Sequence, residues 1–122
     1  MARQEVMHEQ WSQFLDNFSR QHEGWLATLE ITGPNVGNKI ETKDLPFRGI
    51  TYDLKGSSRN NVSIFMAIND QEDETHTITN PSHIRFASDQ GIDRELELES
   101  GDGDRAILRF THPIRSESVD PL

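Results

Sequence analysis

The sequence contains no cysteine among its 122 residues, and this absence excludes several kinds of chemistry at once. Without thiols the chain can form no disulfide, no thiolate nucleophile and no zinc–thiolate site. Long apolar runs are missing too: no stretch approaches the roughly 18 residues typical of a membrane span, and Met1–Glu5 does not open a secretory-type apolar segment. We therefore expect a cytoplasmic protein that does not bind or cross a membrane.

Apolar residues are scarce throughout the chain. Hydrophobic residues make up 33% of the sequence, the mean hydropathy is −0.72 and the formal net charge is −9. These values approach those of disordered chains, which cannot bury enough apolar surface to fold. The apolar residues are periodic, however, and this placement indicates a thin, ordered core. A chain of this length is predicted to form a single domain over residues 1–122.

The chain has 12 basic and 21 acidic residues, and the excess of acidic residues is concentrated in one stretch. The stretch from Asp70 to Asp104 is rich in acids and has only two basic residues, Arg85 and Arg94. A negative field of this kind repels phosphate backbones and anionic membranes. Nucleic-acid binding is therefore disfavoured, and the partners that remain are another protein or further copies of the chain in a homo-oligomer.

The residues that are present change their periodicity at Gly24. Before it, one helical face is marked by Met7, Trp11, Phe14, Leu15, Phe18 and His22. After it, Trp25, Ala27, Leu29 and Ile31 alternate with more polar residues, which is typical of a half-buried strand. The pattern predicts a helix over about residues 5–23, capped by Gly24, and strands over about residues 25–111. A helix of this length needs a partner surface, so we expect its apolar stripe to pack on the sheet.

Several local features refine this prediction. Pro46 is expected to break a strand because proline has no backbone N–H. Turn-forming residues predict loops at Lys55–Asn61 and Ser100–Asp104, and the second loop would join two strands of a hairpin. The glutamates before that turn and the arginines after it are expected to pair across an exposed face. Residues 112–122 carry no apolar periodicity and are expected to form a loose tail.

Together these patterns predict an α+β fold. An N-terminal amphipathic helix would pack on a bent, mainly antiparallel sheet of about six strands, and closure into a small barrel remains open. A helix followed by five or more strands also occurs in Sm-like barrels, which bind RNA. That likeness is one of fold alone, and the acidic charge argues against an Sm-like nucleic-acid binder.

Motifs for chemistry are weak. The chain has no G-x-S-x-G elbow and no phosphate-binding G-x-x-x-x-G-K-[ST] loop. His76 and His83 would meet if their segments paired, but two histidines make an incomplete metal site. Asp102-Gly103-Asp104 lacks the oxygen ligands of a full calcium loop, so it predicts a hairpin turn. We therefore assign no catalytic, metal or cofactor-binding residue and expect no cofactor.

Three functions remain open. The leading hypothesis is a non-enzymatic interaction or assembly module, because short strands leave edges that can pair with another chain. The first alternative is a small-molecule-binding domain or enzyme with a pocket between helix and sheet, near Trp11, His22, Trp25 and Tyr52. The second alternative is the Sm-like nucleic-acid binder, which the charge disfavours.

One stretch of the chain resembles a known family. Its motif is Trp11-x-x-Phe14-x-x-x-Phe18-Ser19-x-x-His22-x-Gly24-Trp25, followed by Leu45-Pro46-Phe47-x-Gly49-Ile50 and Asp53-Leu54. These residues resemble a family of small bacterial proteins catalogued only as a domain of unknown function. The segments Leu96–Ser100 and Leu108–Phe110 fit the same resemblance, which thus covers most of the chain. The resemblance implies a bacterial, cytoplasmic protein and transfers no site.

Overall fold

A single antiparallel sheet of eight strands dominates the computed structural model, which describes residues 2–34, 37–53, 60–89 and 92–112. The strand order is β1-β6-β7-β8-β2-β3-β4-β5. The elements are β1 (Ala2–Glu5), a 3-10 turn (His8–Gln10), α1 (Trp11–His22), β2 (Leu26–Gly33), β3 (Gly37–Tyr52), β4 (Val62–Asn69), β5 (Glu72–Ile78), β6 (Pro81–Asp89), β7 (Ile92–Ser100) and β8 (Arg105–His112).

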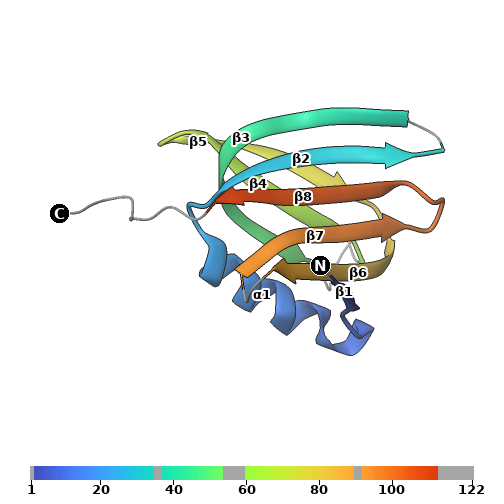
Figure 1. The fold of residues 1–122 in the computed structure, drawn as a ribbon. Helices are drawn as coiled ribbons and strands as arrows, with labels where there is room; N and C mark the ends of the chain where they lie inside the picture. Colours follow the sequence, from blue (N-terminus) through green and yellow to red (C-terminus); the bar gives the residue numbers. More distant parts are fainter. Residues whose placement is uncertain (1, 35–36, 54–59, 90–91, 113–122) are drawn as a thin grey trace.

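The long strand β3 turns this sheet into two layers. Its 16 residues pair with β2 as far as Pro46 and with β4 from Phe47 onward. The first layer holds β1, β6, β7, β8, β2 and the start of β3, and the second holds the end of β3 with β4 and β5. Figure 1 shows β4 and β5 crossing behind the first layer, with α1 along one side of the molecule.

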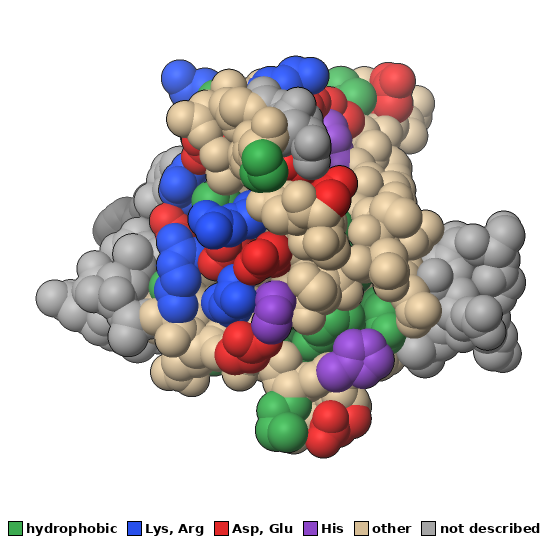
Figure 2. Space-filling view, turned by 90° about the vertical axis from the view of Figure 1, so that its right-hand side faces the viewer, with side chains coloured by type: hydrophobic (Ala, Val, Ile, Leu, Met, Phe, Trp, Pro, Cys, Tyr) green, Lys and Arg blue, Asp and Glu red, His purple; other side chains and the backbone are tan. Residues whose placement is uncertain are grey.

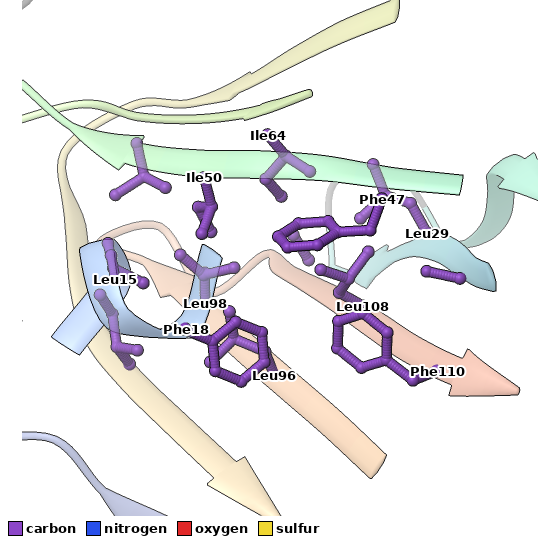
Figure 3. Close-up of a cluster of buried hydrophobic side chains, with 14 of the residues drawn as sticks. Leu15, Phe18, Leu29, Phe47, Ile50, Ile64, Leu96, Leu98, Leu108 and Phe110 are labelled. Atoms are coloured by element: carbon purple, nitrogen blue, oxygen red, sulfur yellow. The ribbon is translucent and has the colours of Figure 1, made fainter. Parts of the chain in front are cut away.

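The core fills the space between the layers and the helix (Figure 3). Leu15 and Phe18 of α1 point toward apolar side chains from both layers, which confirms that the helical stripe from Trp11 to His22 packs on the sheet. Met7, the first residue of the predicted stripe, precedes α1 and is 59% exposed. The sheet contributes Leu29, Phe47, Ile50, Ile64, Leu96, Leu98, Leu108 and Phe110. Leu96 and Leu98 of β7, like Leu108 and Phe110 of β8, are two positions apart, as the period-two pattern predicts. Phe47 and Ile50 of β3 are three positions apart because a register shift lies between Phe47 and Gly49.

The prediction of about six strands was wrong, because the sheet formed by the described residues has eight. The question of closure, which the sequence left open, is answered by the same strand order: the sheet is open, with β1 and β5 at its ends. One added strand is β1, which precedes the predicted helix of residues 5–23 and overlaps it only at Glu5. It is too short and polar to show a strand period, yet it pairs with β6 from Ala2↔Ser88 to Glu5↔Arg85. The helix consequently begins at Trp11, after the 3-10 turn.

The sequence predicted that Pro46 would break a strand. Instead, Pro46 lies within one continuous strand, β3. It lies where β3 exchanges its partner from β2 to β4, and the next residue donates its N–H to the Trp25 carbonyl at 2.8 Å. The Ser100–Asp104 hairpin turn is confirmed, with the Ser100 N–H donated to the Asp104 carbonyl at 2.8 Å. Of the predicted tail, His112 belongs to β8 and residues 113–122 lie outside the described residues, as do residues 54–59 of the predicted loop.

Candidate functional site: the edge of β5

Two strands, β1 and β5, end the sheet, and they differ in length. β1 has 4 residues, whereas β5 has 7 and pairs with β4 from Ala67↔Asp73 to Val62↔Ile78. Within the described ranges, β5 forms backbone pairs with β4 alone. Its second edge is therefore a row of backbone donors and acceptors on which another strand can pair.

Natural edge strands are protected by shortness, charged side chains, proline or bulges. On β5 a register shift occurs only at the first residue, between the pairs Asn69↔Glu72 and Ala67↔Asp73. Its sequence, EDETHTI, contains neither lysine nor proline, and its pairing with β4 is regular from Asp73 to Ile78. Only its acidic residues could repel a second strand. The Asp73 carboxylate, however, accepts a hydrogen bond from Arg48 Nε at 2.9 Å, and Glu74 lies 3.2 Å from His76 Nε2. The charge of Asp73 is thus already paired with that of Arg48.

The inner side of β5 carries a three-residue polar cluster with β3. Thr42 Oγ1 donates to Glu74 Oε1 at 3.0 Å and lies 3.1 Å from His76 Nε2. Thr42 is only 4% exposed, while both partners are partly exposed. In a nucleophilic triad the carboxylate and the hydroxyl contact opposite ring nitrogens. Here both contact Nε2, so the arrangement ties β5 to β3 and does not form a proton relay.

The two histidines considered as metal ligands do not meet. His76 lies on β5 at one end of the strand order, whereas His83 lies on β6 near the other end and contacts Glu5. The condition under which they would meet, pairing of their two segments, is not fulfilled, because β5 pairs with β4 and β6 pairs with β1 and β7. No group of three His, Asp or Glu side chains in the described part of the chain is placed to hold a metal ion.

The four residues of the predicted pocket form two separate pairs at opposite ends of α1. Trp11 contacts Tyr52 with ring centroids 5.5 Å apart, and its Nε1 donates to the Val6 carbonyl at 3.0 Å. His22 contacts Trp25 with centroids 4.5 Å apart. Since a helix rises about 1.5 Å per residue, the two pairs are separated by roughly 16 Å along the axis.

One of these four residues lines a surface hollow. A hollow of about 510 Å³ lies between α1 and the end of β3, lined by Glu9, Ser12, Gln13, Leu15, Asp16, Ile50, Thr51 and Tyr52. Six of these eight residues are polar, and about half of the lining surface is apolar, whereas small-molecule sites are lined predominantly by apolar side chains. Binding of a small molecule near Trp11, His22, Trp25 and Tyr52 stays a prediction.

The outer face of β6, β7 and β8 carries a lattice of alternating charges. Glu97 is only 5% exposed, and its carboxylate lies 2.9 Å from Arg3, 3.3 Å from Arg105 and 3.7 Å from Arg85. Glu95 pairs with Arg3 and Arg109, each at about 3 Å. Figure 2 shows such interleaved basic and acidic side chains. The predicted pairing of glutamates with arginines across the hairpin is thus confirmed.

Hydrogen bonds in this lattice shift the ionisation of its members. The hydrogen bond from Arg85 lowers the pKa of Glu99, and the same contact raises the pKa of Arg85. The pKa of Arg109 is raised mainly by its hydrogen bond to Glu30. Because each charge is matched by an opposite one, this face stabilises the attachment of β1, β7 and β8 and leaves little net potential for an ionic ligand.

Sequence reasoning missed the edge cluster and the role of β5. Thr42 and His76 are 34 positions apart, and nothing in the local pattern of either segment indicates that they meet. The signal that was available is the composition of residues 72–78, which are all polar except Ile78. Such a composition is typical of an exposed edge strand.

Comparisons with known proteins identify a family and a relative but no activity. No helix in the described ranges is both long enough and apolar enough to cross a membrane. The chain is 28% identical over 114 residues to an uncharacterized protein of the bacterium Aquifex aeolicus (strain VF5). The matched region covers 93% of this chain and 96% of the relative. No solved structure matches it. The family model of the Family of unknown function (DUF5335) matches residues 2–119, so the predicted resemblance is confirmed and the chain belongs to this family.

Proposed function

We propose that this bacterial domain is a cytoplasmic, non-enzymatic interaction module that binds an extended segment of polypeptide along β5. The observation that supports the proposal is the second edge of this seven-residue strand, on which no other strand of the described ranges pairs. An added strand would gain backbone hydrogen bonds along the whole edge, and these supply affinity in strand addition.

Side chains on the two faces of β5 would supply selectivity. Asp73, Thr75 and Thr77 are exposed on the outer face, whereas Glu74, His76 and Ile78 are partly buried on the inner face. A partner strand would place its own side chains beside each set, because opposite residues of paired strands point to the same face. The acidic and hydroxyl groups favour a partner segment with complementary polar residues.

The proposal is tested by site-specific photo-crosslinking in bacterial cells that express the full chain. A photoreactive residue at Thr75 on β5 should form an adduct of discrete mass with a protein partner or with another copy. The matched position is Gln4, which is exposed on β1, the other edge strand. Adducts at Thr75 and few at Gln4 are the expected result. No adduct at Thr75, or equal yields at both positions, would overturn the proposed function.

A further inference from the structure

The sequence of β5 is complementary to itself when two copies run antiparallel. We propose that the segment added to β5 is the β5 strand of a second copy, related by a two-fold axis that passes through Thr75. This inference rests on the proposed function, since it requires β5 to accept a strand.

The register follows from the order of the residues in β5. A two-fold axis perpendicular to the sheet at Thr75 places Glu74 opposite His76 of the second copy, and His76 opposite its Glu74. Asp73 lies opposite Thr77, and Glu72 lies opposite Ile78, so no two acids face each other. Directly opposed side chains have Cβ atoms about 4.5–5.5 Å apart, which is within reach of an ion pair or hydrogen bond.

Neighbouring registers fit less well. An axis at Glu74 opposes two carboxylates directly and leaves one end of the strand unpaired. An axis at His76 opposes two imidazoles and leaves Glu72 and Asp73 without opposite residues. Of these three registers, only the one at Thr75 pairs all 7 residues of the strand, and it places each Glu74 opposite a His76.

The two acids at the start of β5 do not prevent this pairing. Asp73 already accepts a hydrogen bond from Arg48, and Glu72 accepts one from Asn69 Nδ2 at 3.3 Å. Each copy carries a formal net charge of −9, however, so long-range repulsion opposes the contact. We expect a reversible dimer of modest affinity, measured at physiological ionic strength, where screening limits this repulsion.

Sedimentation equilibrium of the purified full chain, from micromolar to millimolar concentration, tests the register. His76→Glu places four carboxylates along the contact, and we expect it to raise the dissociation constant at least about tenfold. The double variant Glu74→His with His76→Glu exchanges the two charges and restores each opposed pair. It should return the constant to within about threefold of the wild type. Because the same exchange also restores the contact of Glu74 with His76 within one copy, the result supports the register only if the wild type and both variants have equal unfolding midpoints in urea.

Two further variants complete the test. His83→Glu changes a histidine that also contacts a glutamate, Glu5, but lies on β6, so it should leave the dissociation constant unchanged. Thr75→Pro removes a backbone donor and should abolish the dimer. Circular dichroism confirms that each variant is folded.

The outcomes separate this inference from the proposed function. A chain that stays monomeric at every concentration overturns the self-pairing, while crosslinks from Thr75 to a different protein would still support strand addition. If the dimer persists in both His76→Glu and Thr75→Pro, it forms elsewhere on the surface. This result overturns the inference, and self-association then no longer supports strand addition at β5. A dimer lost in Thr75→Pro but kept in His76→Glu overturns the register.

Discussion

The hydroxyl of Ser19 hydrogen-bonds to the backbone of Ile50 where a neighbouring strand would otherwise pair. Ser19 Oγ on α1 accepts the Ile50 N–H at 2.9 Å and lies 2.9 Å from the Ile50 carbonyl oxygen. Its single proton is shared between that carbonyl and the Leu15 carbonyl, which lies at 2.8 Å. On its other edge Ile50 pairs with Ile64 of β4. The helix thus covers an edge of β3 and satisfies its backbone through one side chain.

Replacement of Ser19 by alanine should lower the free energy of unfolding by about 1–3 kcal/mol. The change leaves the Ile50 N–H without its acceptor, and an unsatisfied buried donor costs about this much. Urea denaturation followed by circular dichroism measures the effect through the transition midpoint.

The matched control is Ser12→Ala on the same helix. Ser12 is exposed, so the free energy of unfolding should change by less than about 0.5 kcal/mol. Equal midpoints for the two variants would show that the contact with Ile50 does not stabilise the docking of α1.

Glu97 is the carboxylate on which the arginine lattice converges, so its charge should matter for stability. We expect Glu97→Gln to lower the free energy of unfolding by about 1–2 kcal/mol, since hydrogen bonds to charged groups contribute about that much and the arginines are partly solvated. Thermal unfolding at low and high salt measures the loss, which should be smaller at high salt.

The control for this substitution is Glu9→Gln on the exposed 3-10 turn. It removes the same charge from the chain without touching the lattice, so it reports the effect of net charge alone. If both variants unfold at the same temperature, the contacts of Glu97 with Arg3, Arg85 and Arg105 add nothing to stability.

The sequence predicted the helix and the alternating strands because local periodicity records which face is buried. It predicted the glutamate–arginine pairs because a short turn places those two strands side by side. It could not predict β1, whose four residues are held by β6, or the partner exchange at Pro46, because both depend on pairing between distant segments. The contact of Thr42 with His76 is of the same kind, and so is that of Ser19 with Ile50.

Acid should destabilise the fold in part through Glu99. Its pKa is lowered in the folded chain by the hydrogen bond from Arg85, relative to an ordinary value of 4.5. A lowered folded pKa means that the stabilisation is complete above the unfolded value and is lost as the pH falls through the folded one. The free energy of unfolding should therefore decrease below pH 4.5, and Glu99→Gln should make that decrease less steep.

Arg85→Met gives an independent check on the same contact, because it removes the donor and keeps the carboxylate. Its stability should also fall less steeply with acid than that of the wild type, as measured by urea denaturation at a series of pH values. Three parallel curves would contradict the assignment of this acid sensitivity to the pair.

His22 is expected to stabilise the core both by its ring and by its Nδ1 proton. The ring is 2% exposed and stacks on Phe18 and Phe110 with centroids 4.0 and 4.9 Å apart. Its Nδ1 lies 2.8 Å from the Phe18 carbonyl, and a carbonyl only accepts, so this nitrogen donates.

His22→Ala removes both interactions and should cost about 2–4 kcal/mol of unfolding free energy, whereas His22→Phe keeps the stacking and should cost about 1 kcal/mol. Gln21→Ala, next to it on the exposed side of α1, should change stability by less than about 0.5 kcal/mol. Equal losses for the alanine and phenylalanine variants in urea denaturation would show that the stacked ring contributes nothing, and that the hydrogen bond to Phe18 accounts for the whole effect.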